Sequence, residues 1–436
     1  MKSTRKFIAA GLAVATMIGV AGCGGSGEVA QEENPTSIKI WHYEESTTAQ
    51  GKAWDKAIEI FEKETGVKVE FEKKAFEQIR QNASQILNSD DAPDVMEYNK
   101  GNATSGLLAS QGLLTNLNDY VSEYGWDKII TGSLADTGKY DEQGVMGSGD
   151  WYGITNYGED CLLYFNQDMF DKYGIAIPTT FDELESAMAK FKENGITALS
   201  VGSAEYPTQH LWWQLVLSKA DDKFIKAYEM YDGKVDWNSE PLTYATEKIK
   251  EWVDKGYISK DSTNLKAEDA GQNFMTGTNP IFFSGTWWHA RFKEEAAGLN
   301  VSYSKFPDTK KIVGSSGNVW VIPQNSAKKD LAAKFINITL SKEVQNYMAE
   351  QGGLAINSDV DSIKDEGTKE FVAQFDDAVK EDQLGFYPDW PTSTFYDELN
   401  ASLQELVNGT ADVKTALNQM KDNYDKGLES SGIVVD

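Results

Sequence analysis

The chain has 436 residues, 40% of them hydrophobic and 11% aromatic, which supplies enough apolar material for one large or two smaller cores and argues against disorder. Its formal net charge of −27 and the absence of a Lys/Arg-rich run argue against a nucleic-acid partner, because binding phosphates requires a concentrated basic face. His42, His210 and His289 are scattered without an HxxxH or CxxC pattern, so we expect no metal site and no cofactor.

The N-terminus has the pattern of an export signal over residues 1–22. A basic start is followed by an apolar run and by small residues before Cys23, a segment too short and wrongly flanked to span a membrane. The ending Val-Ala-Gly-Cys resembles a bacterial lipoprotein signal, which implies lipidation at Cys23; the alternative is an ordinary signal with an incidental cysteine. Residues 23–36 are rich in Gly and Glu without periodicity and predict a flexible tether. Cys161 is then left without a disulfide partner and is expected to be a buried thiol.

The body begins with strands and helices in alternation. Short or alternating apolar runs predict strands over 37–41, 67–73 and 92–99. Apolar residues at helical spacing predict helices over 53–64 and 76–87. This order indicates βαβ units and a mainly parallel sheet flanked by helices.

A second α/β series begins near residue 151. It contains a predicted strand over 161–166, a helix opened by the capping box of Thr180 and Glu183, and a further strand over 196–202. The C-terminal third is largely helical. Two series in one chain predict two α/β lobes, with a ligand held in the crevice at the carboxyl ends of their strands.

A family resemblance begins with Cys23 and the strand-loop segment 38–46, and it continues in order through 92–117, 152–184, the FFSGTWW stretch at 282–288, and 317–360. Together these segments resemble the extracellular solute-binding proteins of carbohydrate ABC importers, the group that includes maltose-binding protein. The resemblance implies a periplasmic-binding-protein-like fold whose two lobes are hinged by several crossings.

The same resemblance implies lobes that are discontinuous in sequence. The N-terminal lobe would hold 37–156 with 322–368, and the C-terminal lobe 157–321 with 369–436. By analogy with the family, the lobes close on a neutral sugar or oligosaccharide and deliver it to the membrane permease of an ABC importer. The protein is then expected to be a monomeric, lipid-anchored receptor outside the cytoplasm, at a bacterial and specifically Gram-positive cell surface, and not an enzyme.

A neutral sugar presents apolar C–H faces and a ring of hydroxyls, so aromatic rings beside Asp, Glu, Asn or His in loops at strand ends are the expected ligand contacts. The candidates from the first lobe and the crossing into the second are Tyr43, Glu44, Tyr98, Asn99, Asn156, Tyr157 and Glu159. The candidates further along the chain are Tyr206, His210, Trp212, Trp287, Asn318, Asp389 and Trp390.

Several of these candidates have a structural alternative. The loop with Tyr43 and Glu44 and the turn with Asp389 and Trp390 are equally compatible with ordinary surface. Glu159 is compatible with a salt bridge at the hinge instead of a ligand contact.

The tryptophans present the same choice. Among the three candidates in 206–212, at least one is expected in the core. Trp287 matches the tryptophan of the family's Gly-x-Trp element and is expected to stack on the sugar. Trp288, turned away by about 100° on a helix, is expected to pack beneath it or at the rim.

Three other functions compete with sugar capture. The same fold could bind a polyamine or another small solute, and a polyamine receptor would show converging acids with aromatics. An anion receptor would need Arg or helix N-termini in the candidate loops, and those loops contain no Arg. A glycoside hydrolase requires two carboxyls about 5 to 10 Å apart, which candidate pairs permit, but the chain has no GxSxG or Walker motif. An adhesion lipoprotein without transport would show no closure on a ligand.

Overall fold

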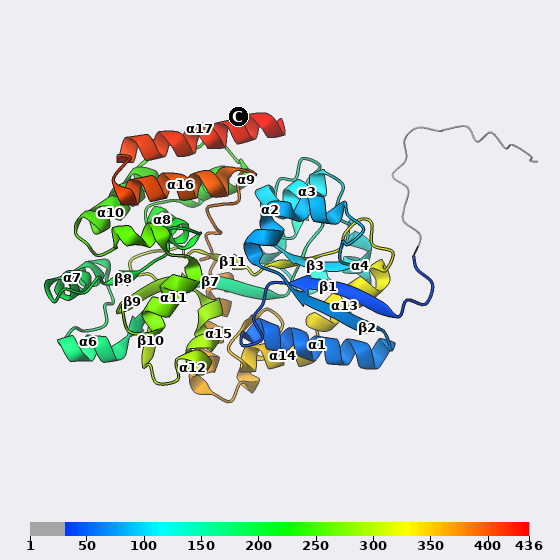
Figure 1. Ribbon diagram of the computed structural model, residues 1–436. Coiled ribbons are helices and arrows are strands. Elements are labelled where there is room, and N and C mark those ends of the chain that lie inside the picture. The colour runs from blue at the N-terminus through cyan, green and yellow to red at the C-terminus, as the bar shows by residue number, and fades with distance from the viewer. Residues whose placement is uncertain (1–30, 436) are drawn as a thin grey trace, which may run out of the picture.

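The first lobe is built on a five-stranded sheet in a computed structural model that describes residues 31–435 (Figure 1). Its strands, in spatial order, are β2 (Lys68–Lys73), β1 (Ser37–His42), β3 (Val95–Tyr98), β12 (Val319–Val321) and β6 (Ile154–Thr155). β1 pairs in parallel with both β2 and β3, so the loops that follow β1 and β3 leave the same edge of the sheet. This edge therefore brings Tyr43 and Glu44 close to Asn99 and Lys100.

Helices cover both faces of this sheet. They are α1 (Ala49–Thr65), α2 (Phe76–Leu87), α3 (Leu107–Ser110), α4 (Asn118–Tyr124), α5 (Ser133–Asp136), α13 (Lys329–Thr339) and α14 (Lys342–Glu350), with a hairpin of β4 (Lys139–Tyr140) and β5 (Asp150–Trp151). α1 starts at Thr48, whose hydroxyl accepts from the Gly51 amide, and ends at Gly66 in the left-handed conformation. Its Trp54 ring packs edge-on against Trp320 of β12, with ring centroids 5.4 Å apart.

The second lobe is built around a long buried strand, β7 (Tyr157–Asn166). Its sheet has the order β10 (Val301–Ser304), β7, β9 (Ile281–Gly285) and β8 (Leu199–Ser200). The first residues of β7 pair instead with β11 (Gly314–Ser316) and β13 (Leu354–Ala355). β7 thus runs from the region between the lobes into the second sheet, where Figure 1 shows it as a long teal strand.

The remaining helices surround this second sheet. They are α6 (Gln167–Tyr173), α7 (Phe181–Glu193), α8 (Pro207–Leu217), α9 (Asp222–Met230), α10 (Glu240–Asp254), α11 (Ala267–Met275), α12 (His289–Glu295), α15 (Glu366–Lys380), α16 (Phe395–Asn408) and α17 (Val413–Ser431). α7 begins with the predicted capping box of Thr180 and Glu183. α16 and α17 pack on each other and on α8 and α10, above the second sheet in Figure 1.

The prediction of two α/β lobes is confirmed, and in each main sheet most strands share one direction while one crossing strand, β12 in the first and β7 in the second, runs against them. β12 runs antiparallel to β3 and β6, and β7 runs antiparallel to β9, β10, β11 and β13. The physical reason is that β7 and β12 belong to the crossings between lobes. A strand that arrives from the other lobe enters the sheet from the opposite end, unlike a strand delivered by a local βαβ turn.

The expected signal peptide and the lipidation at Cys23 lie outside the described residues. The described end of the predicted tether touches the first lobe, since the Glu32 amide donates to the Ala327 carbonyl at 2.7 Å and the Lys329 amide donates to Gln31 Oε1 at 3.1 Å. Over residues 31–435, no helix combines the length and the apolar character that a membrane span requires. The lobe boundaries at 156/157, 321/322 and 368/369 stay a prediction.

Candidate ligand-binding site

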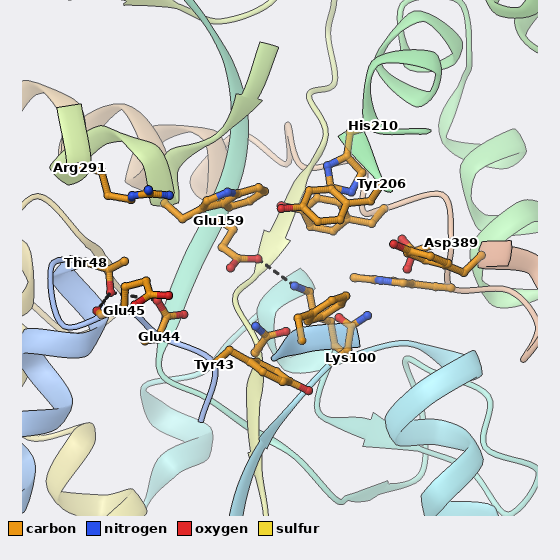
Figure 2. Close-up of a pocket in the computed structure, with 17 residues that line it drawn as sticks. Tyr43, Glu44, Glu45, Thr48, Lys100, Glu159, Tyr206, His210, Arg291 and Asp389 are labelled. Atoms are coloured by element: carbon orange, nitrogen blue, oxygen red, sulfur yellow. Dashed lines mark hydrogen bonds and ion pairs between the residues drawn. The ribbon is translucent and has the colours of Figure 1, made fainter. Parts of the chain in front are cut away.

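A cavity of about 940 Å³, a volume that includes open solvent, lies between the two lobes. Its lining residues are Tyr43, Glu44, Glu45, Thr48, Phe76, Asn99, Lys100, Glu159, Tyr206, His210, Trp287, Arg291, Asn318, Tyr387, Asp389, Trp390 and Tyr396. Figure 2 shows these side chains converging from loops of both lobes, with the crossing strand β7 behind them. The cavity therefore depends on how the lobes meet and belongs to neither lobe alone.

One side of the cavity is a row of aromatic rings, which we call the aromatic wall: Trp287, Tyr206, His210, Tyr387 and Trp390. Ring centroids in this row are 6.2 Å apart for Trp287 and Tyr206, 4.9 Å for Tyr206 and His210, and 4.8 Å for His210 and Tyr387. Tyr387 and Trp390 follow at 5.7 Å. The row presents an apolar surface with polar edges, which suits the C–H face of a sugar ring.

The row depends on local backbone geometry at two points. Trp287 lies in a short 3-10 turn at the carboxyl end of β9, and its ring folds over Gly285, where a Cβ atom would collide with it. At the other end, Gly101 has a φ of 109°, and a Cβ there would collide with the Trp390 side chain. Glycine is needed at position 101 both for the left-handed backbone and for this close approach.

The opposite side, which we call the polar wall, follows β1 and β3 and consists of Tyr43, Glu44, Glu45, Thr48, Asn99 and Lys100. Glu44 accepts a hydrogen bond from Thr48 Oγ1 at 3.0 Å and another from the Tyr157 hydroxyl at 3.3 Å. Burial and, secondly, the nearby Glu159 carboxylate raise the pKa of Glu44 from 4.5 to about 7. Near neutral pH this carboxyl therefore exists in both protonation states, and its neutral form can donate as well as accept a hydrogen bond.

Lys100 connects the two walls. Its ammonium pairs with Glu159 at 2.9 Å, and both side chains are largely buried. The same ammonium lies 4.8 Å from the Tyr387 ring centroid and 5.8 Å from that of Trp390. Figure 2 shows the Lys100–Glu159 contact at the centre of the cavity. The hinge salt bridge considered for Glu159 is therefore present, and the same residue also lines the cavity.

Three further groups set the electrostatics. Burial, and to a lesser extent Lys100, lowers the pKa of His210 to about 3, so its imidazole is neutral in the physiological range. Burial raises the pKa of Asp389 to about 6. Arg291, at the rim, is neutralised by Glu268 and Glu295, each at 2.8 Å. The cavity thus contains cations that sequence analysis did not anticipate, but both Lys100 and Arg291 have carboxylate partners within the protein.

The structure brings most of the predicted site residues together. Those that line the cavity are Tyr43, Glu44, Asn99, Glu159, Tyr206, His210, Trp287, Asn318, Asp389 and Trp390. Trp288, by contrast, is 2% exposed, packs edge-on against Phe282 and lies beneath the Arg291 guanidinium. The two neighbouring tryptophans therefore occupy the different positions that were expected for them.

Four predicted residues lie outside the lining of this cavity. Trp212 is fully buried in α8, where it donates to Thr246 Oγ1, because every residue of that helix is buried inside the second lobe. Asn156 is also fully buried and donates to Thr339 Oγ1. Tyr157 lies behind the polar wall, where its hydroxyl holds Glu44 and Glu97. Tyr98 lines a different cavity.

Several lining residues were not predicted from the sequence: Glu45, Thr48, Phe76, Lys100, Arg291, Tyr387 and Tyr396. Lys100 directly follows the candidate Asn99, and Tyr387 lies two residues before the candidate Asp389, so extending the two loops by one or two residues finds them. Phe76 and Tyr396 are on helices, α2 and α16, whose faces toward the cavity are fixed only by packing. Nothing in their sequence context separates them from core residues.

A two-lobed α/β fold with a cavity lined from both lobes defines the class of solute receptors. Residues 44–346 match the family described as "Bacterial extracellular solute-binding protein", and the chain belongs to that family. Within the described residues, no group of His, Cys, Asp and Glu is arranged to hold a metal ion.

Curated relatives share part or most of the chain. A "Probable sugar-binding periplasmic protein" of Rhizobium meliloti is 27% identical over 209 residues, which cover 46% of this chain and 47% of that protein. The chain thus spans about half the length of this relative and of the similar Brucella protein. The "Diacetylchitobiose binding protein DasA" of Streptomyces coelicolor is 24% identical over 411 residues, covering 88% of this chain and 90% of that protein.

Solved structures share the fold. A structure from work on xylan utilization by Caldanaerobius polysaccharolyticus superposes with a TM-score of 0.75 at 19% identity, covering 89% of this chain and 99% of that one. A "Chitin oligosaccharide binding protein" superposes with a TM-score of 0.74 at 18% identity, covering 90% and 99%. At identities of 19% and 18%, this structural similarity shows that the fold is shared and does not identify a ligand.

Proposed function

We propose that this protein is the substrate-capture component of an ABC importer and binds a neutral sugar or oligosaccharide between its lobes. The observation that carries the proposal is the cavity itself, where the aromatic wall faces the polar wall across the gap between the lobes. Aromatic rings cover the C–H faces of a sugar, and carboxyl and amide groups bond its hydroxyls.

The state of the charged groups favours a neutral ligand. Lys100 and Arg291 are compensated within the protein, so an anion would find no unpaired cation among the lining residues. Glu44 and Asp389 have raised pKa values because of burial, which makes them suited to hydroxyl groups near neutral pH. The names of the sugar-binding relatives support the same ligand class.

Contacts between the lobes on both sides of the cavity support a closing mechanism. On one side, Lys52 of α1 pairs with Glu294 of α12, and Thr47 donates to Glu295 at 3.3 Å. On the other side, Arg80 of α2 pairs with Asp397 of α16 at 2.9 Å. These contacts are polar and partly exposed, so each is of modest strength and can break when the lobes open.

The cellular role goes beyond the cavity. We infer that the protein acts outside the cytoplasm as a monomer, is held to the membrane by lipid on Cys23, and presents its closed form to a permease. The lipoprotein-like signal and the family support this role, as they support a Gram-positive cell surface. It binds its ligand without converting it.

One observation favours a second candidate, a polyamine. The lining contains the carboxyls of Glu44, Glu45, Glu159 and Asp389 against two cations that are already paired. A linear cation would be held by unpaired carboxyls and aromatic faces. The neutral-sugar proposal predicts that such cations bind weakly or not at all.

A thermal-shift screen of a carbohydrate library, with putrescine and spermidine in the same plates, tests the proposal. A ligand at a hundred times its dissociation constant adds about 2.7 kcal/mol to the stability of the folded state, so a true ligand raises the melting temperature clearly. Chromatography of each positive sugar after prolonged incubation checks for turnover. Stabilisation by polyamines alone would replace the sugar by a cation, and a hydrolysed sugar would make the protein an enzyme.

A further inference from the structure

A second cavity adjoins the first. It has a volume of about 1010 Å³, again including open solvent, and Asp389 and Tyr396 line both cavities. Its walls, like those of the first cavity, come from both lobes: α2 and residues 103–108 on one side, and residues 389–397 on the other. The second cavity is therefore a continuation of the gap between the lobes.

One face of α2 runs along both cavities. Phe76, its first residue, lines the first cavity, and Arg80 and Ser84 line the second. These residues are four positions apart, so they lie on the same face of the helix. At 1.5 Å per residue, the path from Phe76 to Ser84 is about 12 Å long. The two cavities together therefore extend along α2 over a distance greater than the width of one side chain.

Asp389 at the junction is a buried carboxyl that accepts a hydrogen bond from its own backbone amide. Its side chain is 7% exposed, and among the described residues no other side chain donates a hydrogen bond to it or forms an ion pair with it. A carboxyl group can accept several hydrogen bonds, so Asp389 can still accept one from a ligand hydroxyl. Figure 2 shows Asp389 at the edge of the first cavity, where a ligand passing between the cavities would meet it.

The chemistry of the second cavity suits hydroxyls. Gln81, Asn82, Ser84 and Thr104 supply amide and hydroxyl groups, and Tyr98 supplies an aromatic ring. The one cation, Arg80, is paired with Glu77 and Asp397, both at 2.9 Å, and stacks on Tyr396. The lining of the second cavity therefore combines uncharged hydrogen-bonding groups with one paired cation and the carboxyls of Asp389 and Asp397.

From this geometry we propose that the second cavity is an additional sugar-binding subsite, so that the protein captures an oligosaccharide long enough to pass Asp389 and Tyr396. The inference rests on the proposed function and specifies its substrate class. Asp389 accepts hydroxyls at the junction, and Tyr98, which sequence analysis named as a ligand residue, contacts the outer end of the chain.

The test is isothermal titration with xylo-, chito- and malto-oligosaccharides of two to six units. In the series that binds, affinity is expected to rise by about tenfold or more once the chain is long enough to leave the first cavity. Gln81→Trp, which fills the second cavity from an exposed position on α2, removes this gain and leaves the shortest ligand unaffected. Ser393→Trp, from the opposite wall and also exposed, has the same effect.

The matched control is Gln78→Trp, on the same helix and equally exposed but outside the lining of both cavities. It keeps the full length dependence. If affinity does not change with chain length, or if Gln81→Trp and Gln78→Trp change the length dependence of affinity equally, the additional subsite is wrong. Either result is still compatible with the capture of a short sugar. If no chain of any length binds, the proposed function is itself wrong.

Discussion

The two walls of the ligand cavity differ in their residues and in the interactions that hold those residues in place. The polar wall comes from loops that follow parallel strands β1 and β3, and its side chains are held by hydrogen bonds such as that from Thr48 to Glu44. The aromatic wall comes from three separate stretches around 206–210, 287 and 387–390, and its rings hold one another. A ligand that needs both surfaces therefore binds well only when the lobes meet.

Lys100 shows how strongly the two walls depend on each other. It is on the polar wall, yet its ammonium is held by Glu159 of the crossing strand and lies over two rings of the aromatic wall. This group links the hinge to both sides of the cavity.

Replacing Lys100 by Met should have the largest effect. It leaves the Glu159 carboxylate buried without its partner, and removing one member of a buried pair costs about 3 to 5 kcal/mol. Urea unfolding followed by tryptophan fluorescence measures the loss. The double variant Lys100→Met/Glu159→Gln should recover part of it, and equal stability of the single and double variants would mean that the pair does not connect the walls.

Replacing Trp287 by Ala tests the aromatic wall. Affinity for every sugar that binds should fall by about thirtyfold, roughly 2 kcal/mol, because one stacking surface is lost regardless of the hydroxyl pattern. Trp41→Ala is the control, since Trp41 is also half-buried but lies outside the cavity lining. Titration calorimetry measures the affinity of both variants for the sugar. Unchanged affinity in Trp287→Ala would remove this residue from the ligand site.

The polar wall should be visible in the pH dependence of stability. Because the pKa of Glu44 is raised to about 7 in the folded protein by burial and by Glu159, folding is favoured by protonation of this group. Its contribution is fully present below pH 4.5 and is lost as the pH rises through about 7.

Glu44→Gln should therefore reduce the fall in the free energy of unfolding between pH 5 and pH 8, by on the order of 1 kcal/mol. Asp160, whose pKa burial also raises to about 7, is unchanged in the variant, so the difference between the two proteins isolates Glu44. Identical pH profiles would show that Glu44 is as well solvated in the folded state as in the unfolded chain.

The contact between α2 and α16 should give the smallest effect. Tyr396→Phe removes the hydrogen bond from the Tyr396 hydroxyl to Glu77, at 2.7 Å, while the ring beneath Arg80 remains. One such bond contributes about 0.5 to 1.5 kcal/mol. Small-angle scattering of the ligand-free protein should show a larger radius of gyration in the variant, and identical curves would mean that this bond does not hold the lobes together.

Much of the polar wall could be predicted because it follows from local rules. A strand followed by a polar loop is visible in the sequence, and parallel strands bring such loops to one edge of a sheet, as with Glu44 and Asn99. Trp287 was found through the family resemblance and not through its immediate context. Trp212 shows the limit of the same approach, because an aromatic residue after a strand end turned inward with its helix.

The alternation of strands and helices, helix caps such as Thr180, and membership of the solute-binding family could be read from the amino-acid sequence. These features depend on local patterns and on their order along the chain. Tertiary structure decided the direction of the crossing strands, the pairing of Lys100 with Glu159, and the arrival of Phe76 and Tyr396 at the cavity. The physical reason is distance along the chain. Residues separated by tens or hundreds of positions are brought together by packing between the lobes, and no local periodicity records which face of a helix that packing selects.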